Sequence, residues 1–154
     1  MFKKILFFGD FSKNSRWAFT YALNLAKTFH AKLLILHVAR GPVYPEQLLF
    51  FLPSEKLEEQ QAFKMEEIKR ELNTYYLQKM EGFKEYEILL RGGVAFYEII
   101  QTTKKESVDL IVMGTYGKKG IEQFLFGSTA EKVLKESPCP VLIVGLQSEK
   151  FIMP

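Results

Sequence analysis

Short apolar runs alternate along this chain with longer stretches in which apolar residues recur every three or four positions. This alternation predicts a parallel β-sheet wrapped by helices, and therefore an α/β fold. The apolar runs show no polar alternation, as expected of strands that are buried on both faces. The predicted strands are Ile5–Gly9, Leu33–Val38, Tyr86–Arg91, Leu110–Met113 and Val141–Val144.

Four helical segments fill the intervals between the predicted strands, each with one inward-facing apolar stripe. The predicted helices are about Ser15–Phe29, Glu55–Met80, Val94–Glu106 and Ser128–Ser137. The expected stripes are Ala18, Ala22, Leu25 and Phe29; Met65, Ile68, Leu72 and Tyr75; Ile99 and Ile100; and Ala130, Val133 and Leu134. Pro138 and Pro140 follow the last helix and end it.

Strands joined in this way by right-handed crossovers wind into a doubly wound sheet. Such sheets bind ligands outside the carboxyl ends of their strands, at the point where the strand order reverses. Candidate site residues are therefore those that follow the first and fourth strands. These are Asp10 and the loop that begins at Gly114.

The 154 residues correspond to one domain, and we expect a single domain over residues 1–154 with a variable loop at about 40–54. Inside that loop the apolar run Leu48–Leu52 lies between prolines. Such a run is typical either of a loop packed over the core or of an exposed lid or partner surface.

Composition excludes several classes of protein. Cys139 is the one cysteine, which rules out an intrachain disulfide, and no Cys or His cluster has the spacing of a zinc site. The net charge of +3 is spread along the chain rather than clustered, unlike that of a nucleic-acid binder. The apolar run at residues 5–8 is too short for a signal-peptide core or a membrane span. We therefore expect a cytoplasmic protein that binds neither nucleic acid nor a membrane.

A glycine pattern follows the fourth predicted strand. Gly114, Gly117, Gly127 and Ser128 stand in the order Gly-x2-Gly-x9-Gly-Ser, and the last of them opens a helix. Glycine permits close backbone approach, and the N–H groups at a helix N-terminus attract anions, so the pattern predicts a phosphate cradle. It is neither the Walker P-loop nor the dinucleotide fingerprint. Alternatively, Ser128 caps its own helix by accepting a hydrogen bond from the backbone near Glu131.

This pattern, in register with the predicted strands, resembles that of the nucleotide-binding subgroup of the universal stress protein family. The similarity extends from Lys4-Ile5-Leu6 to Pro138–Val144. It implies a Rossmann-like five-stranded parallel sheet in the order 3-2-1-4-5, with helices on both faces, and binding of ATP, ADP or AMP. It also implies a homodimer through Val141–Val144, an edge strand that would otherwise expose unpaired backbone groups.

The resemblance also implies roles for individual residues. Asp10 would lie near the ribose and phosphates, Val38 would contact adenine through its backbone, Met113 and Gly114 would form the floor of the ribose pocket, and Gly117, Gly127, Ser128 and Thr129 would cradle the phosphates. Two of these residues have a plainer interpretation. Asp10 is also typical of a turn or N-cap before a helix, and Val38 of a buried core.

The functional hypothesis is a nucleotide-dependent stress-response or signalling module with an unidentified protein partner. Asp10 and Ser128 would hold Mg²⁺ or Mn²⁺ together with the phosphates, while Lys118 and Lys119 are either phosphate-neutralising or solvated. No catalytic residue is predicted, because no second acid has an obvious place and His37 is expected to be packed in the core. A slow Mg- or Mn-dependent ATPase and a nucleotide-independent dimeric interaction module remain the alternatives.

Overall fold

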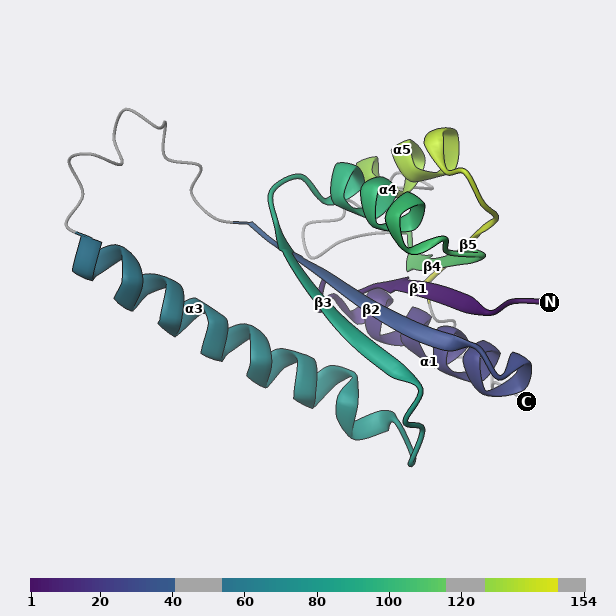
Figure 1. Ribbon diagram of the computed structural model, residues 1–154, viewed down its shortest axis with the longest axis horizontal. Coiled ribbons are helices and arrows are strands. Elements are labelled where there is room, and N and C mark those ends of the chain that lie inside the picture. The colour runs from purple at the N-terminus through teal and green to yellow at the C-terminus, as the bar shows by residue number, and fades with distance from the viewer. Residues whose placement is uncertain (41–53, 116–126, 147–154) are drawn as a thin grey trace.

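In the computed structural model, residues 1–40, 54–115 and 127–146 are described, and they form a β-sheet with helices on both faces (Figure 1). The strands are β1 (Lys4–Phe8), β2 (Lys32–Ala39), β3 (Tyr86–Gly92), β4 (Leu110–Gly114) and β5 (Val141–Val144). The helices are α1 (Lys13–Phe29), α3 (Ser54–Tyr75), the 3₁₀ helix η1 (Leu77–Lys79), α4 (Ala95–Glu106) and α5 (Ser128–Glu136). The predicted variable loop after Arg40 and its run Leu48–Leu52 lie outside the described residues.

The five strands pair in parallel in the order β3-β2-β1-β4-β5, which confirms the expected α/β fold and its strand order. Each predicted strand agrees with the observed one to within one residue at either end. The central strands are apolar because both of their faces are covered. Ile5, Phe7 and Ile35, for example, have no exposed surface.

Two apolar layers cover the sheet, one on each face. In Figure 1, α1 and α3 lie on one side of the sheet and α4 and α5 on the other. Alternate strand residues divide between the layers, as the two-residue repeat of a strand requires. Ile5, Phe7, Leu33 and Ile35 face α1 and α3, and Leu6, Phe8, Leu34 and Leu36 face α4 and α5.

Three of the predicted helix stripes needed correction. In α1 the buried face contains Phe19 and Leu23 between alanines, whereas Leu25 is half-buried and Phe29 is 36% exposed. Both faces of α1 carry apolar residues at helical spacing, so periodicity could not choose between them. Met65 in α3 and Leu134 in α5, both predicted to face inward, are also exposed.

The second predicted helix was also too long. The segment Glu55–Met80 was expected to be one helix, but α3 ends at Tyr75 and a 3₁₀ turn follows. Tyr76, between the two, has no exposed surface. The break turns the chain so that this side chain enters the core.

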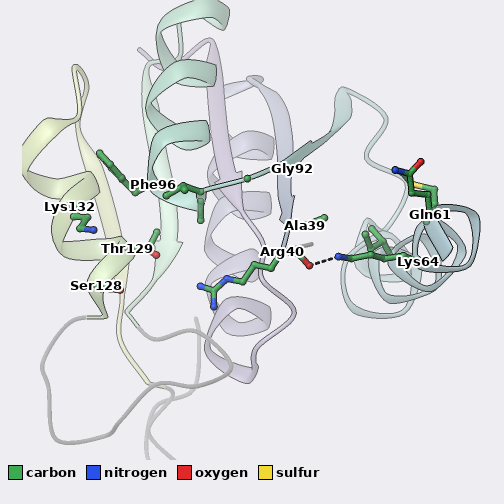
Figure 2. Close-up of a pocket in the computed structure, with 14 residues that line it drawn as sticks. Ala39, Arg40, Gln61, Lys64, Gly92, Phe96, Ser128, Thr129 and Lys132 are labelled. Atoms are coloured by element: carbon green, nitrogen blue, oxygen red, sulfur yellow. Dashed lines mark hydrogen bonds between the residues drawn. The ribbon is translucent and has the colours of Figure 1, made fainter. Parts of the chain in front are cut away.

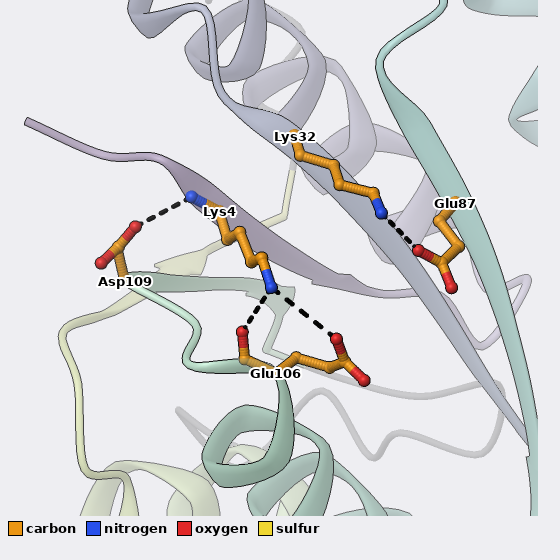
Figure 3. Close-up of polar contacts among 5 residues, drawn as sticks. All are labelled: Lys4, Lys32, Glu87, Glu106 and Asp109. Atoms are coloured by element: carbon orange, nitrogen blue, oxygen red, sulfur yellow. Dashed lines mark hydrogen bonds and ion pairs between the residues drawn. The ribbon is translucent and has the colours of Figure 1, made fainter.

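Polar contacts fasten the amino ends of the strands, at the edge opposite the candidate site (Figure 3). The carboxylate of Asp109 accepts hydrogen bonds from the backbone amides of Lys3 and Lys4 at 2.7 and 2.8 Å. Lys32 and Glu87 form an ion pair between β2 and β3. The amide hydrogen bonds lower the pKa of Asp109, because they stabilise its charged form.

Candidate functional site

The carboxyl ends of β1 and β4 lie side by side, because these strands pair directly where the strand order reverses. Phe7 is opposite Val112, so the residues that follow the two strands emerge at the same edge. Asp10 and Gly114 are those residues, as the topology rule predicts.

Asp10 stabilises the turn between β1 and α1. Its Oδ1 atom accepts a hydrogen bond from the amide of Ser12 at 2.9 Å, and its own amide donates to the hydroxyl of Ser15. The N-cap of α1 is Ser12, whose hydroxyl accepts from the amide of Ser15 at 3.0 Å. The turn interpretation of Asp10 is therefore confirmed and the N-cap interpretation is wrong. The carboxylate is half-buried at this edge.

The rings of Phe11, His37 and Tyr76 pack together beneath the turn between β1 and α1, on its core side. Phe11 has a φ of 65°, in the left-handed region, and its ring stacks on His37 with centroids 4.2 Å apart. The amide of Phe11 donates to the hydroxyl of Tyr76, which lies 2.8 Å from the hydroxyl of Ser15. Burial raises the pKa of Tyr76, so its phenol stays protonated. His37 Nδ1 lies 2.7 Å from the carbonyl oxygen of Gly9, which confirms that this histidine is packed and hydrogen-bonded.

Tyr76 was missed as part of the site, because the sequence placed it inside a continuous helix. Gly9 is the one local indication of it. A Cβ atom on Gly9 would lie 2.7 Å from the ring of Tyr76, so the residue that follows β1 must be glycine for the ring to fit.

Gly114 is required for a second close contact. A Cβ atom there would lie 2.4 Å from Asn14 Oδ1, which also accepts a hydrogen bond from the hydroxyl of Thr115 at 3.1 Å. The amide group of Asn14 donates to the carbonyl oxygens of Val144 and Gly145, both at 3.0 Å. The side chain of Asn14 thus connects the start of α1 to the ends of β4 and β5. Sequence reasoning did not identify it.

The two described ends of the glycine pattern meet. The amide of Gly127, the N-cap of α5, donates to the carbonyl oxygen of Thr115 at 2.6 Å. Ser128 is exposed, and the amide of Glu131 donates to the carbonyl oxygen of Gly127. The capping role of Ser128 is therefore wrong. Gly117, Lys118 and Lys119 lie outside the described residues.

Val38 and Met113 are buried in the layer that faces α4 and α5, with 6% and 3% of their surface exposed. The core interpretation of Val38 is confirmed. The side chains of both residues are occupied by packing, so any contact with a ligand would use their backbone atoms.

A cavity of about 800 Å³ opens at this same edge, beside the ends of β2 and β3 (Figure 2). Of the sequence-predicted site residues, Ser128 and Thr129 line it, whereas Asp10, Val38, Met113, Gly114 and Gly127 do not. Other polar lining residues are Arg40 after β2, Gln61 and Lys64 of α3, and Lys132 of α5. Sequence reasoning did not assign these residues to the site.

Within residues 1–40, 54–115 and 127–146, no group of three or more His, Cys, Asp or Glu residues has a geometry that would hold a metal ion. No helix in the same ranges is long and apolar enough to cross a membrane.

The parallel sheet in the order β3-β2-β1-β4-β5, covered by helices on both faces and with a cavity at its carboxyl edge, defines a Rossmann-like α/β fold. Within that class the particular family is shown. The model of the universal stress protein family matches residues 1–145, and this chain belongs to that family.

Individual relatives agree with this assignment. The chain is 35% identical to the universal stress protein MJ0531 of Methanocaldococcus jannaschii over 147 residues, covering 94% of this chain and 82% of the relative. It is 34% identical to YxiE of Bacillus subtilis over 155 residues, covering 94% and 99%. Among solved structures, MJ0577 superposes with a TM-score of 0.77 at 30% identity, covering 97% of this chain and 99% of that one. A universal stress protein in complex with cAMP superposes with a TM-score of 0.66 at 23% identity, covering 93% and 97%, and shows the shared fold.

Proposed function

We propose that this universal stress protein binds ATP or a related adenine nucleotide at the carboxyl edge of its sheet and acts as a nucleotide-dependent stress-response or signalling module. One observation carries the proposal. The amide of Gly127 donates a hydrogen bond to the carbonyl oxygen of Thr115, which joins the start of α5 to the end of β4. The first two residues of α5, Ser128 and Thr129, line the cavity. A phosphate bound at this helix start would meet free backbone N–H groups.

The remaining roles follow the strand ends. Asp10 would bind the ribose or the phosphates, the backbone of Val38 the adenine ring, and Met113 and Gly114 would form the floor beneath the ribose. Gly117 would complete the phosphate cradle. The solved family member in complex with cAMP supports an adenine nucleotide as the ligand class at the level of the shared fold.

A divalent cation would accompany the nucleotide. Asp10 and Ser128 carry oxygen atoms, the donor type that Mg²⁺ and Mn²⁺ prefer, on the two sides of the switch point. The cation would neutralise phosphate charge. We expect slow turnover or none.

We also propose a homodimer through β5. This strand pairs with β4 on one side, and Val141, Leu142 and Ile143 are half-buried. A second copy would pair with its other edge and cover these side chains. A location in the cytoplasm remains an expectation from the sequence.

Native mass spectrometry of the purified protein tests nucleotide and subunit number together. Thermal unfolding with ATP, ADP, AMP and cyclic AMP then measures binding. A ligand at 100 times its Kd stabilises the protein by about 2.7 kcal/mol, and the melting temperature should rise by roughly 5–10 °C. Asp10→Ala and Ser128→Ala should reduce this rise. Thr28→Ala, which removes an exposed hydroxyl near the other end of the sheet, should not. No rise with any of the four nucleotides would refute the proposal.

A further inference from the structure

We propose that Arg40 determines the ligand specificity of this cavity, so that it selects polyphosphate ligands over cyclic monophosphate ones. The inference deepens the proposed function and rests on it. It names a residue that neither the glycine pattern nor the strand ends indicate.

Arg40 lines the cavity from the end of β2. It directly follows that strand and is exposed. Figure 2 shows its guanidinium extending from the end of β2 toward the side of the cavity where Ser128 and Thr129 begin α5. Its carbonyl oxygen accepts a hydrogen bond from Lys64, which connects the residue to α3. The backbone of Arg40 is therefore held both by its connection to β2 and by its hydrogen bond to Lys64 of α3.

The described lining carries positive charge only. Arg40 after β2, Lys64 of α3 and Lys132 of α5 contribute it, and none of the described residues on the cavity wall is an aspartate or glutamate. Lys132 lies four residues after Ser128 in α5, so the two share a helix face. Its ammonium group lies 5.6 Å from the centre of the Phe96 ring. A concave site with one sign of charge concentrates ligands of the opposite sign.

Two helices add to this field. The first residues of α4 and α5, Ala95 and Ser128, both line the cavity. Neither helix has a side-chain hydrogen bond at its N-cap, which is Val94 in α4 and Gly127 in α5. The partial positive charge of both N-termini adds to that of the three cations.

This arrangement discriminates by charge and by shape. A guanidinium presents parallel N–H groups that match two phosphate oxygens at once, and a di- or triphosphate chain offers several such pairs. A cyclic monophosphate has a single negative charge and a ring that holds its phosphate close to the ribose. A polyphosphate chain therefore offers one anionic group to the start of α5 and another to Arg40, whereas a cyclic nucleotide offers a single anionic group in all.

Titration calorimetry on the full chain tests the inference, with EDTA present so that no metal masks phosphate charge. The probes are ATP, cyclic AMP and inorganic tripolyphosphate. Arg40→Gln should weaken the binding of ATP and of tripolyphosphate about five- to tenfold, as expected for the loss of one partly screened charged hydrogen bond. The affinity for cyclic AMP should change less than about twofold, because its single phosphate depends less on Arg40. Lys105→Gln, which removes an exposed cation that does not line the cavity, is the matched control.

Two results separate this inference from the proposed function. If Arg40→Gln weakens ATP and cyclic AMP equally, or changes ATP no more than Lys105→Gln does, Arg40 does not set the specificity, although the site still binds nucleotide. If the unmodified protein binds no adenine nucleotide, either with EDTA or with Mg²⁺ in place of EDTA, the proposed function fails. Tripolyphosphate then decides the role of Arg40: weaker binding by Arg40→Gln supports it as an anion ligand, and unchanged binding overturns it.

Discussion

Replacing Gly114 with alanine tests whether the contact between β4 and α1 forms as described. The new Cβ atom would lie 2.4 Å from Oδ1, 2.8 Å from Cγ and 3.3 Å from the backbone carbonyl carbon of Asn14. Real Cβ atoms essentially never approach other atoms more closely than 3.0 Å. The side chain of Asn14 must therefore move.

The cost of that movement follows from its hydrogen bonds. The Asn14 side chain donates to Val144 and Gly145 and accepts from Thr115, and it is 4% exposed, so water would not replace the lost partners. Each such bond contributes about 1 kcal/mol net, so the loss of three would destabilise the fold by about 3 kcal/mol. For a chain of this length the melting temperature should fall by roughly 6–12 °C.

Urea unfolding followed by circular dichroism measures this change. Gly92→Ala is the matched control, because a Cβ atom there has no neighbour within 4 Å. Its effect should stay within about 1 kcal/mol. A double-mutant cycle with Asn14→Ala identifies the partner, since removing the amide should relieve most of the cost of Gly114→Ala. If Gly114→Ala costs less than about 1 kcal/mol, or the same amount in both backgrounds, then the clash with Asn14 is not the reason for this glycine.

Two further substitutions test the buried phenol and the carboxylate at the opposite edge. Tyr76→Phe should lower the free energy of unfolding by about 1–3 kcal/mol, because the hydroxyl of Ser15 and the buried amide of Phe11 each lose a hydrogen-bond partner. Tyr97 is exposed, so Tyr97→Phe should leave the free energy of unfolding unchanged, and equal effects of the two substitutions would refute this reasoning. Asp109→Asn should cost less than about 1 kcal/mol at pH 7, since the carboxylate is partly exposed. Folding lowers the pKa of Asp109, so the stabilisation by its carboxylate is present above the pKa of the unfolded state and disappears as the pH falls through the pKa of the folded state. The urea unfolding curves of the unmodified protein and of Asp109→Asn should therefore converge below about pH 4. A constant gap, or an equal loss in Glu136→Gln, would contradict this reasoning.

The strands could be predicted closely because their determinant is local. A strand covered on both faces needs a continuous apolar run, and each of the five runs is visible without knowledge of its neighbours. Helix faces were harder. Both the face of α1 that contains Phe19 and the face that contains Leu25 have apolar residues at helical spacing, and only packing against the sheet selects the first.

Some residues of the candidate site could likewise be identified from local sequence, and others could not. The glycine pattern and Asp10 could be found from the sequence, since close backbone approach and turn chemistry depend on a few adjacent residues. Asn14, Tyr76 and Arg40 could not. The hydrogen bonds of Asn14 reach residues 101, 130 and 131 positions away, and Tyr76 contacts Phe11 and Ser15 across 65 and 61 positions.

The sequence by itself therefore determined an alternating α/β chain with a glycine-bounded loop after its fourth strand, because apolar runs, helical periods and turn residues act over short distances. Only the tertiary structure decided which side chains line the cavity at the carboxyl edge of the sheet. Hydrogen-bond partners and the charge of a cavity depend on distances between segments that are remote in the chain. Arg40, Lys64 and Lys132 belong to one cavity only because three separate elements end or pass at the same edge of the sheet.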